Sequence, residues 1–329
     1  MSGVAVISGG VGAARFLRGL IDASERELVP VRTADIAAVV NTGDDLTMHG
    51  LSISPDLDTI VYTLAGAIDP DRGWGLVGES WRAIESLERY GAVRPDGSFA
   101  AARWFNLGDQ DLATHFYRTS RLAEGAALTE VTDEIRRAWQ VPIRVLPMSD
   151  EPCRTVVTID HGGRREEVSF QDYFVRLRHD VPVAAVRFDG SARLSDAARE
   201  AITDAATVVI APSNPLVSIG PIRSLPDVDT LLAERRERVV AVSPIVGGDA
   251  LKGPAARMLT ELGHEASVVG VARLYAPIAS VLVIDPTDAA LADAVEAAGM
   301  RCLIHPSVMS TPERARSLAA GVLDAVRDR

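Results

Sequence analysis

The sequence is poor in residues on which several protein classes depend. Its 329 residues include only two cysteines, Cys153 and Cys302, too few and too far apart for a disulfide framework or a zinc ribbon. Lysine is nearly absent: Lys252 is the only one, and the other basic residues are arginines. The net charge of -11 excludes the basic surface needed to bind nucleic acid or an anionic membrane non-specifically. We therefore expect small-molecule ligands, with no nucleic-acid partner and no membrane partner.

Long apolar runs are also missing from the sequence. No stretch is long and uncharged enough to predict a membrane-spanning helix. Residues 1–8 resemble a short strand and lack the basic flank of a signal peptide. With 47% hydrophobic residues, the chain has ample material for a large core. These features predict a globular, cytoplasmic protein.

Alternating strand and helix patterns predict the fold class. Apolar, β-branched runs predict strands at 4–8, 36–40, 143–146, 183–188, 207–211, 239–242, 281–284 and 302–304. Helical patterns between many of them imply a mostly parallel sheet with right-handed crossovers. Turn glycines predict a small β-hairpin over 155–170. We expect one α/β domain over 1–329, Rossmann-like, with helices on both faces of the sheet.

Residues 57–140 have mostly helical periodicity. Candidate helices are 62–67, 80–90, 111–123 and 129–139. We expect this segment to be a helical cap insertion over the crevice at the carboxyl ends of the strands. It contains all four tryptophans, among them Trp74, Trp81 and Trp104. Core packing explains any one of them, but together they suit a flat heteroaromatic ligand.

Four carboxylates follow the predicted strand 36–40 within a short stretch: Asp44, Asp45, Asp56 and Asp58. Carboxylate oxygens at the carboxyl end of a parallel strand predict a site for a divalent cation such as Mg²⁺. Asp44 and Asp45 are the first candidates, with Asp58 or Asp56 completing the site. Asp56 and Asp58 cannot both face the same way at a helix start, so we expect one of them to cap that helix.

A general base is the second role open to these aspartates. Either Asp44 or Asp45 is suited to orient or deprotonate an attacking hydroxyl. His49 and His115 are alternative bases, although no partner spacing supports them.

A glycine-rich turn over 9–15 separates the strand 4–8 from a predicted helix at 16–23. Glycines at a helix start free backbone N–H groups for a phosphate. The spacing matches neither a Walker loop nor the G-x-G-x-x-G fingerprint, so a tight structural turn explains it equally well. Two later strand-end loops, 212–221 and 243–253, are rich in small and polar residues. Together the three loops predict a nucleotide crevice.

Six ordered motifs resemble the transferase family of coenzyme F420 biosynthesis, known as 2-phospho-L-lactate or phosphoenolpyruvate transferases. The motifs are GGVGAARF, NTGDDLTMHGLSISPDLDTIVYTL, DPDRGWG, WFNLGDQDLATH, APSNPLVSIGPI and SPIVGGDALKGPA. They run from Val4 to about Met258 with family-like spacing. The resemblance implies a Rossmann-like sheet with a helical cap.

The resemblance also implies a reaction. The terminal ribityl hydroxyl of the deazaflavin Fo attacks the diphosphate of a guanosine-diphospho-linked three-carbon acid, GMP leaves, and Mg²⁺ is required. The arginine-rich composition and DPDRGWG resemble actinobacterial members, which favours an enolpyruvyl over a lactyl or glyceryl group. We expect a homodimer, the commonest assembly for such an enzyme.

Ligand-binding residues carried over from the family form two groups. For the nucleotide and its diphosphate they are Gly9, Gly10, Gly12, Ala13, Arg15, Ser213, Asn214, Pro215, Gly220, Gly247 and Gly248. For Fo they are Asp44, Trp74, Trp81, Arg82 and Asp109. Ala13 departs from the family, which usually repeats glycine there, and we expect an ordinary φ at this residue.

Two alternatives belong to other classes. A non-catalytic, nucleotide-sugar-binding regulator of the same fold would lack the cap motifs around Trp74 and Asp109, which are present. A Rossmann-type NAD(P) oxidoreductase is opposed by the glycine spacing, the clustered aspartates and the lack of a clear catalytic pair.

Overall fold

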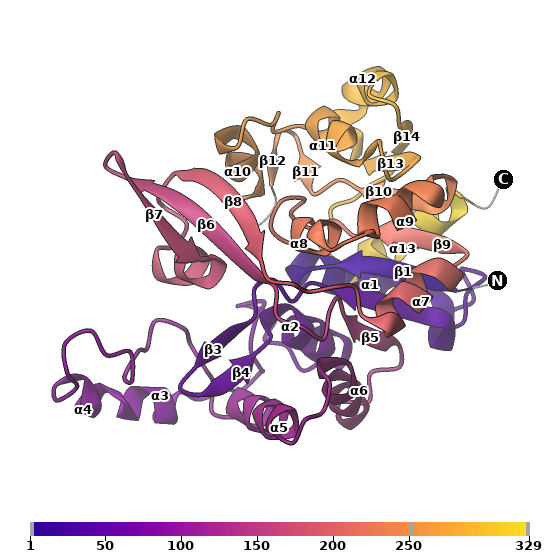
Figure 1. Ribbon diagram of the computed structural model, residues 1–329. Helices are drawn as coiled ribbons and strands as arrows, with labels where there is room; N and C mark the ends of the chain where they lie inside the picture. Colours follow the sequence, from indigo (N-terminus) through magenta and orange to yellow (C-terminus); the bar gives the residue numbers. More distant parts are fainter. Residues whose placement is uncertain (1–2, 251–252, 327–329) are drawn as a thin grey trace.

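A computed structural model describes residues 3–250 and 253–326 of the chain (Figure 1). Its centre is a seven-stranded parallel sheet in the spatial order β14 (Arg301–Ile304), β13 (Val281–Ile284), β10 (Val239–Val242), β9 (Thr207–Ile210), β1 (Val4–Ser8), β2 (Ile36–Val40) and β5 (Arg144–Pro147). The short apolar runs of the sequence form these strands because both faces of the sheet are covered. The predicted α/β class with a mostly parallel sheet is confirmed.

Helices cover both faces of this sheet. One layer contains α1 (Gly10–Glu25), α2 (Pro55–Leu64), α6 (Leu128–Ala138) and α13 (Pro312–Asp324). The other contains α7 (Asp196–Asp204), α8 (Gly220–Ser224), α9 (Val228–Glu234), α10 (Ala255–Glu261), α11 (Val268–Tyr275) and α12 (Ala292–Ala297). Successive strand residues point to opposite faces. Val4 and Val6 of β1 therefore pack against the first layer, whereas Ala5 and Ile7 pack against the second.

The order of the strands reverses at β1. This strand pairs with β2 on one side and with β9 on the other, in register from Val4 to Ile36 and from Val4 to Thr207. The loops after β1 and β9 therefore leave the sheet in neighbouring positions, where open α/β sheets form a ligand crevice. A hydrogen bond from Ser213 Oγ to the carbonyl of Gly9, 2.7 Å long, joins the two loops.

Three smaller sheets flank the main one. They are the hairpin β3 (Leu46–Met48) and β4 (Leu51–Ile53), the hairpin β11 (Ile245–Val246) and β12 (Asp249–Ala250), and an antiparallel sheet in the order β7 (Arg164–Ser169), β6 (Arg154–His161) and β8 (Val183–Asp189). The hairpin predicted over 155–170 is confirmed by β6 and β7. A π-helix at Asp172–Arg176 precedes β8.

The prediction that strand 183–188 belongs to the parallel sheet is wrong. β8 pairs antiparallel with β6 instead. Burial alternates along β8, so one face is packed and the other faces solvent. This pattern is typical of an antiparallel strand, whereas a central parallel strand is buried on both faces.

Several helix boundaries differ from the prediction. The helix expected at 62–67 is α2, which begins at Pro55, a residue favoured in the first turn, and ends before Gly66 with φ 70°. The helix expected at 80–90 is divided into α3 (Arg82–Ser86) and α4 (Glu88–Gly91). The helix α5 (Asp111–Ala123) has the predicted bounds. Short 3₁₀ helices lie at Thr33–Asp35, Arg236–Arg238 and Pro286–Leu291.

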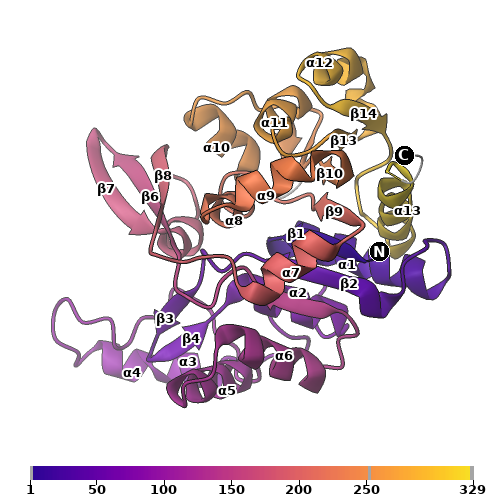
Figure 2. The same ribbon diagram turned by 45° about the vertical axis from the view of Figure 1, so that its right-hand side comes forward.

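The small elements project to one side of the molecule. In Figures 1 and 2, the sheet β6–β8 and the helices α3 and α4 extend from the same side, opposite the two termini and α13. Within the described ranges, no helix has both the length and the apolarity that crossing a membrane requires.

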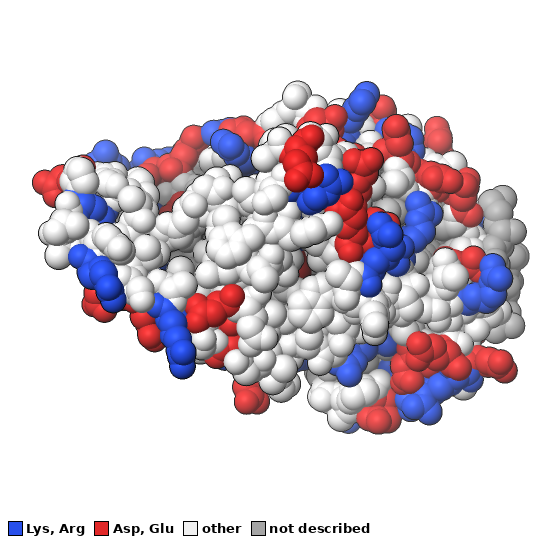
Figure 3. All heavy atoms as spheres, turned by 90° about the horizontal axis from the view of Figure 1, so that it is seen from below, with Lys and Arg blue, Asp and Glu red and all other residues white. Residues whose placement is uncertain are grey.

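The face carrying α3 to α6 has an uncharged middle. Figure 3 shows it from below, with charged side chains mostly toward its rim. Phe116 and Tyr117 of α5 and Val93 and Phe99 beyond α4 are among the exposed large apolar side chains.

Candidate active site

The loop 41–45 after β2 is held on several sides. Asn41 Oδ1 accepts a hydrogen bond from the Gly43 N–H at 2.8 Å, a local turn that aspartate and asparagine favour. Asn41 Nδ2 donates to Asp56 Oδ2 at 2.9 Å. The carbonyl of Gly43 accepts from the Thr155 N–H at 2.8 Å, so the start of β6 fixes the loop from the opposite side. The position of Asp44 is therefore set by two separate parts of the fold.

Three carboxylates share this region: Asp44, Asp45 and Asp56. Burial raises the pKa of Asp44 well above its usual range, and the charges of Asp56 and Asp45 raise it further. Burial likewise raises the pKa of Asp45 well above its usual range, and it raises that of Asp56 to about 6. The three groups therefore hold negative charge at a substantial energetic cost unless a cation joins them.

The donor set of Asp44, Asp45 and Asp56 suits a hard divalent cation. Within the described part of the chain, Asp44 Oδ1 and Asp45 Oδ1 are buried and have no hydrogen-bond partner. Buried polar atoms are normally satisfied, so two unpartnered carboxylate oxygens in one cluster indicate a missing positive ligand. Mg²⁺ takes oxygen ligands and usually combines a few carboxylates with water and substrate phosphate. These residues therefore fit such an ion.

Asp58 is placed apart from this cluster. Its carboxylate forms an ion pair with the guanidinium of Arg118, with both side chains nearly completely buried. The N-cap position of α2 is Ser54, so neither Asp56 nor Asp58 is the cap, contrary to expectation. Both aspartates lie in the first turn of α2, where the helix dipole favours negative charge.

The two histidines lie in different settings. His49 is exposed in the turn between β3 and β4, and its Nε2 lies 2.9 Å from the carbonyl oxygen of Ala102. His115 is 1% exposed and faces Asp111, with Nε2 3.3 Å from Oδ2. Neither ring has a recorded hydrogen bond or ion pair with Asp44 or Asp45 among the described contacts.

The predicted turn over 9–15 is mostly helix. Gly9 is the N-cap position of α1, and the helix begins at Gly10, which has φ 68°. A Cβ at Gly12 would overlap the carbonyl oxygen of Pro212, so the close approach of two backbones requires glycine there. Ala13 has no left-handed φ, as expected, and its side chain packs in the core. Only the backbone of Ala13 remains for a ligand.

The helix terminus of α1 faces the acidic cluster. A backbone hydrogen bond from Gly10 favours the charged form of Asp56. A Cβ at Gly9 would lie 3.1 Å from Asp56 Oδ2. Arg15 lies further along α1, half-buried. The structure thus brings together the glycine loop and the acidic loop, two motifs that are far apart in the sequence.

The loop 212–220 uses most of its polar atoms internally. Asn214 Oδ1 accepts from the Leu216 N–H at 2.9 Å, and Ser213 is bonded to Gly9. Pro215 is buried, and a Cβ at Gly220 would lie 3.1 Å from the ring of Phe188. The loop therefore lies beside the glycine loop, with its shape fixed before any ligand binds.

Gly247 and Gly248 form the turn between β11 and β12, with φ 62° and 81°. The N–H of Gly247 donates to Asp288 Oδ2 at 2.9 Å. These two glycines therefore shape a hairpin, and at least the N–H of Gly247 is already occupied.

Four of the residues predicted for Fo, namely Trp74, Trp81, Arg82 and Asp109, lie around two contacts in the segment 66–110, whereas Asp44 lies in the acidic loop after β2. The guanidinium of Arg72 lies over the rings of Trp74 and Trp81, at 5.4 and 4.9 Å from their centroids. Asp109 accepts from Ser80 Oγ at 2.5 Å and from the N–H groups of Arg82 and Ala83 at 3.1 and 3.0 Å. Its carboxylate therefore caps α3. A cavity of about 400 Å³ is lined by Trp81, Ile84, Glu85, Arg103 and Asn106.

Sequence reasoning missed three residues that shape the acidic cluster: Asn41, Ser54 and Arg118. Asn41 was visible as the first residue of the acidic motif, and its bond to Asp56 could have been suspected. Ser54 Oγ donates to Asp45 Oδ2 at 2.7 Å. Arg118 lies sixty positions from Asp58, and no local signal connects the two.

Comparison with known proteins identifies the class of molecule that carries this site. The family model for 2-phospho-L-lactate transferase CofD matches residues 4–305. The chain belongs to this family, and the resemblance predicted from the six motifs is confirmed. The chain is accordingly a transferase, which excludes the alternative of an NAD(P) oxidoreductase.

The chain is also similar to individual relatives that are named phosphoenolpyruvate transferase. The chain is 38% identical to the phosphoenolpyruvate transferase of Streptomyces griseus, covering 99% of this chain and 98% of the relative. It is 40% identical to that of Streptomyces avermitilis, with 97% of each covered, and 39% identical to that of Mycobacterium tuberculosis, with 94% of each covered. A solved structure of a UPF0052 family member from Bacillus halodurans matches with a TM-score of 0.59 at 16% identity over 99% of this chain and 98% of that one. This last match concerns the fold alone.

Proposed function

We propose that this transferase moves a phosphoenolpyruvyl group from a guanosine-diphospho donor to the terminal hydroxyl of Fo in coenzyme F420 biosynthesis, releasing GMP. A 2-phospholactyl group is the alternative cargo. The observation that carries the proposal is the cluster of Asp44, Asp45 and Asp56 beside the N-terminus of α1, with two buried carboxylate oxygens unpartnered. Relatives named phosphoenolpyruvate transferase, at 38% and 40% identity, support the choice of cargo.

The reaction exchanges one P–O bond for another. The Fo hydroxyl oxygen bonds to the phosphorus that bears the three-carbon acid, and the bond from that phosphorus to the GMP oxygen breaks. The hydroxyl proton goes to a carboxylate, for which Asp44 and Asp45 are the candidates because burial raises the pKa of both. Such a transfer depends on positioning and charge neutralisation more than on covalent chemistry by the protein.

Asp44, Asp45 and Asp56 would hold Mg²⁺, which when bound supplies positive charge for the diphosphate. The N-terminus of α1 supports the same group through the helix dipole and the N–H groups of its first turn, apart from that of Gly10, which bonds to Asp56. We assign the guanosine part to the neighbouring loop with Ser213, Asn214, Pro215 and Gly220. Arg15 is assigned to the diphosphate.

We assign Fo to the cap segment 57–140, at the cavity lined by Trp81. Trp81 offers an indole face to a flat ring, and Asn106 offers both a donor and an acceptor to a heterocycle edge. Trp74, Arg82 and Asp109 belong to the same segment and support this cavity through Arg72 and through the cap of α3.

The proposed enzyme is a cytoplasmic homodimer. Its acidic surface supports the absence of nucleic-acid and membrane partners. Light scattering after size-exclusion chromatography measures the assembly, and a monomer mass at micromolar concentration would contradict the dimer.

Mass spectrometry of products tests the reaction. The full chain is incubated with Fo, Mg²⁺ and, in separate reactions, enolpyruvyl-, lactyl- or glyceryl-diphosphoguanosine. We expect an Fo phosphodiester together with equimolar GMP, greatest for the enolpyruvyl donor. Asp44→Asn lowers the activity by at least about 100-fold, whereas Asp133→Asn, which changes an aspartate on α6 with a partly exposed side chain, retains it.

A failure of all three donors would reject the catalytic assignment. Tight binding of guanine nucleotide or a nucleotide-sugar, without product, would favour the regulatory alternative of the same fold.

A further inference from the structure

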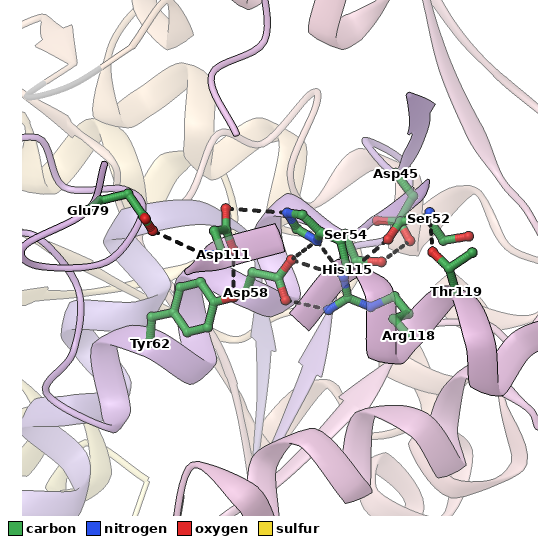
Figure 4. A network of polar contacts seen from close by, with 10 residues as sticks. All are labelled: Asp45, Ser52, Ser54, Asp58, Tyr62, Glu79, Asp111, His115, Arg118 and Thr119. Carbon is green, nitrogen blue, oxygen red and sulfur yellow. Dashed lines mark hydrogen bonds and ion pairs between the residues drawn. The ribbon is translucent and has the colours of Figure 1, made fainter. Parts of the chain in front are cut away.

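Arg118 of α5 is the largest side chain that is almost completely buried, at 1% exposed among the described residues. Its guanidinium binds the carboxylate of Asp58 through two contacts: Nη1 donates to Oδ2 at 3.1 Å, and Nη2 pairs with Oδ1 (Figure 4). Two parallel contacts of this kind fix both the position and the orientation of the carboxylate. Asp58 is therefore held by α5, a helix from a distant part of the chain.

The surroundings of Arg118 have the composition of a metal site. Ligand atoms of Asp58, Asp111 and His115 all lie within 4.8 Å of one another. Two carboxylates and an imidazole suit several divalent metals. Here, however, Arg118 Nη1 also lies 3.3 Å from His115 Nδ1. Arginine only donates hydrogen bonds, so Nδ1 is the acceptor and its lone pair is directed to the guanidinium.

Other atoms of this group also face partners in the network, although His115 Nε2 makes no hydrogen bond among the described residues. Tyr62 Oη donates to Asp111 Oδ1 at 2.6 Å, and His115 Nε2 lies 3.3 Å from Asp111 Oδ2. The N–H of Asp111 donates to Glu79 Oε2 at 3.1 Å, which connects the group to the segment 66–110. Figure 4 shows these residues as one continuous network. Its negative charges already face a cation that belongs to the chain.

This network adjoins the proposed metal site. Ser54 Oγ donates to Asp45 Oδ2 at 2.7 Å, and the Ser52 N–H donates to Thr119 Oγ1 on α5 at 2.8 Å. The charge of Arg118 also acts on Asp45, where it favours the ionised form. Two acidic groups therefore lie next to each other. The group of Asp58, Asp111 and His115 contains the guanidinium of Arg118. The group of Asp44, Asp45 and Asp56 has unpartnered oxygens on Asp44 and Asp45.

We propose that Arg118 is a positioning residue that serves as a built-in cation: it keeps Asp58, Asp111 and His115 from binding a metal, and so directs the divalent cation to Asp44, Asp45 and Asp56. This inference rests on the proposed cation site. It assigns Asp58 to the support of the site rather than to the metal.

Titration of the full chain with Mn²⁺ tests the proposal. Calorimetry gives the affinity, and electron paramagnetic resonance gives the number of bound ions. The native chain is expected to bind a single Mn²⁺. Arg118→Met exposes the second group, and we expect a second Mn²⁺ to bind there. In the double variant Asp58→Asn with Arg118→Met, the second ion is lost and the single high-affinity ion remains. The double variant also removes both buried charges, so it keeps the test available should the single variant not fold.

The control is Arg121→Met on the same helix, which breaks a partly buried pair with Glu134 of α6 and should leave Mn²⁺ binding unchanged. The proposal is overturned if Arg118→Met binds a single Mn²⁺ with native affinity. It is also overturned if the double variant loses the high-affinity ion, because Asp58 would then be a ligand.

Asp44→Asn separates this test from the proposed function. It should weaken the high-affinity Mn²⁺ by at least about 10-fold. Native binding in that variant would reject the proposed cation site itself, whatever Arg118 does.

Discussion

The carboxyl edge of the main sheet and the segment 66–110 both contribute residues to the proposed active site, but they are built differently. At the sheet edge, backbones pack directly: Gly12 touches the loop at Pro212, and Ser213 is bonded to Gly9. The segment 66–110 contains two helices of five and four residues, α3 and α4. It is held largely by side chains, among them Glu79, Asp109 and Arg72.

This difference indicates that the sheet edge is more rigid than the segment 66–110. Few buried apolar contacts and much exposed backbone lower the free energy of local opening. Trp74, Tyr90 and Phe99 are exposed in the segment, whereas β1 and β2 are buried throughout. We therefore expect substitutions at the sheet edge to affect the chemical step and the fold, and those in the segment to affect binding of the acceptor.

The largest effect is expected from Arg118→Met, because Arg118 lies in the network of polar contacts between Asp45 and Glu79 of the segment 66–110 (Figure 4). Removing one partner of a buried ion pair leaves Asp58 charged and unpaired, at a cost of about 3–5 kcal/mol in the free energy of unfolding. Urea unfolding measures it. Arg121→Met, which breaks a pair that is still partly exposed to solvent, should cost less, about 1 kcal/mol. Similar losses in the two variants would contradict the distinction.

Asp44→Asn should lower kcat about 100- to 1,000-fold, because it removes charge that acts in the transition state. Steady-state kinetics with the enolpyruvyl donor measures the change. Asp109→Asn in the segment should instead raise the KM for Fo more than it lowers kcat, since its carboxylate caps α3. Equal losses of kcat in the two variants would contradict the expected difference between the sheet edge and the segment 66–110.

Gly12→Ala should destabilise the protein by about 1–3 kcal/mol, as overpacking does. The added Cβ meets the backbone of Pro212 and must push the two loops apart. Gly91→Ala is the matched change in the segment, where no atom lies within 4 Å of an added Cβ. Thermal unfolding of both variants measures the contrast, and equal melting temperatures would be incompatible with it.

Trp81→Ala should raise the KM for Fo about 10-fold, which corresponds to about 1.4 kcal/mol of lost binding. The loss removes the indole face at the cavity and one ring beside Arg72. Fluorescence titration with Fo gives the affinity directly. Unchanged affinity would remove this cavity from the acceptor site.

The smallest effect concerns the end of α1 away from the glycine loop. Asp22 binds Arg26 and Arg316, each at 2.6 Å, and the hydrogen bond from Arg26 is the main cause of its lowered pKa. A lowered pKa stabilises the fold above the unfolded value of about 3.9, and the contribution is lost as the pH falls through the folded value.

Asp22→Asn should therefore cost less than about 1 kcal/mol near pH 6 and nothing at a pH below the folded pKa of Asp22. Urea unfolding over this range checks it. A difference that grows toward acid pH would have the wrong sign.

Part of this molecule was predictable because the signal is local. The run 36–40 is apolar and β-branched, and β2 has those bounds. The aspartates after it were expected at a strand end, and Asp44 lies there. The helix 111–123 was predicted because its periodicity is strong and uninterrupted.

The remainder depends on contacts between distant residues. The glycines at 9–12 suggested a phosphate turn, yet Gly12 is also required by the loop after β9. Asp58 was predicted as a candidate metal ligand, and nothing nearby in the sequence reveals that its carboxylate pairs with Arg118. Strand 183–188 was assigned to the wrong sheet because its apolar content, not its partner, was visible.

The position of β1 has a consequence for synthesis of the chain. This strand leaves the ribosome well before β9, which begins at Thr207, yet it lies in the middle of the sheet and pairs with β9. At about 5–20 residues per second, roughly 10–40 seconds pass before that partner is translated. During this time one edge of a strand that is apolar from Val4 to Ile7 has no neighbour, so β1 and β2 depend on α1, and on whatever binds nascent chains, to stay apart from other polypeptides.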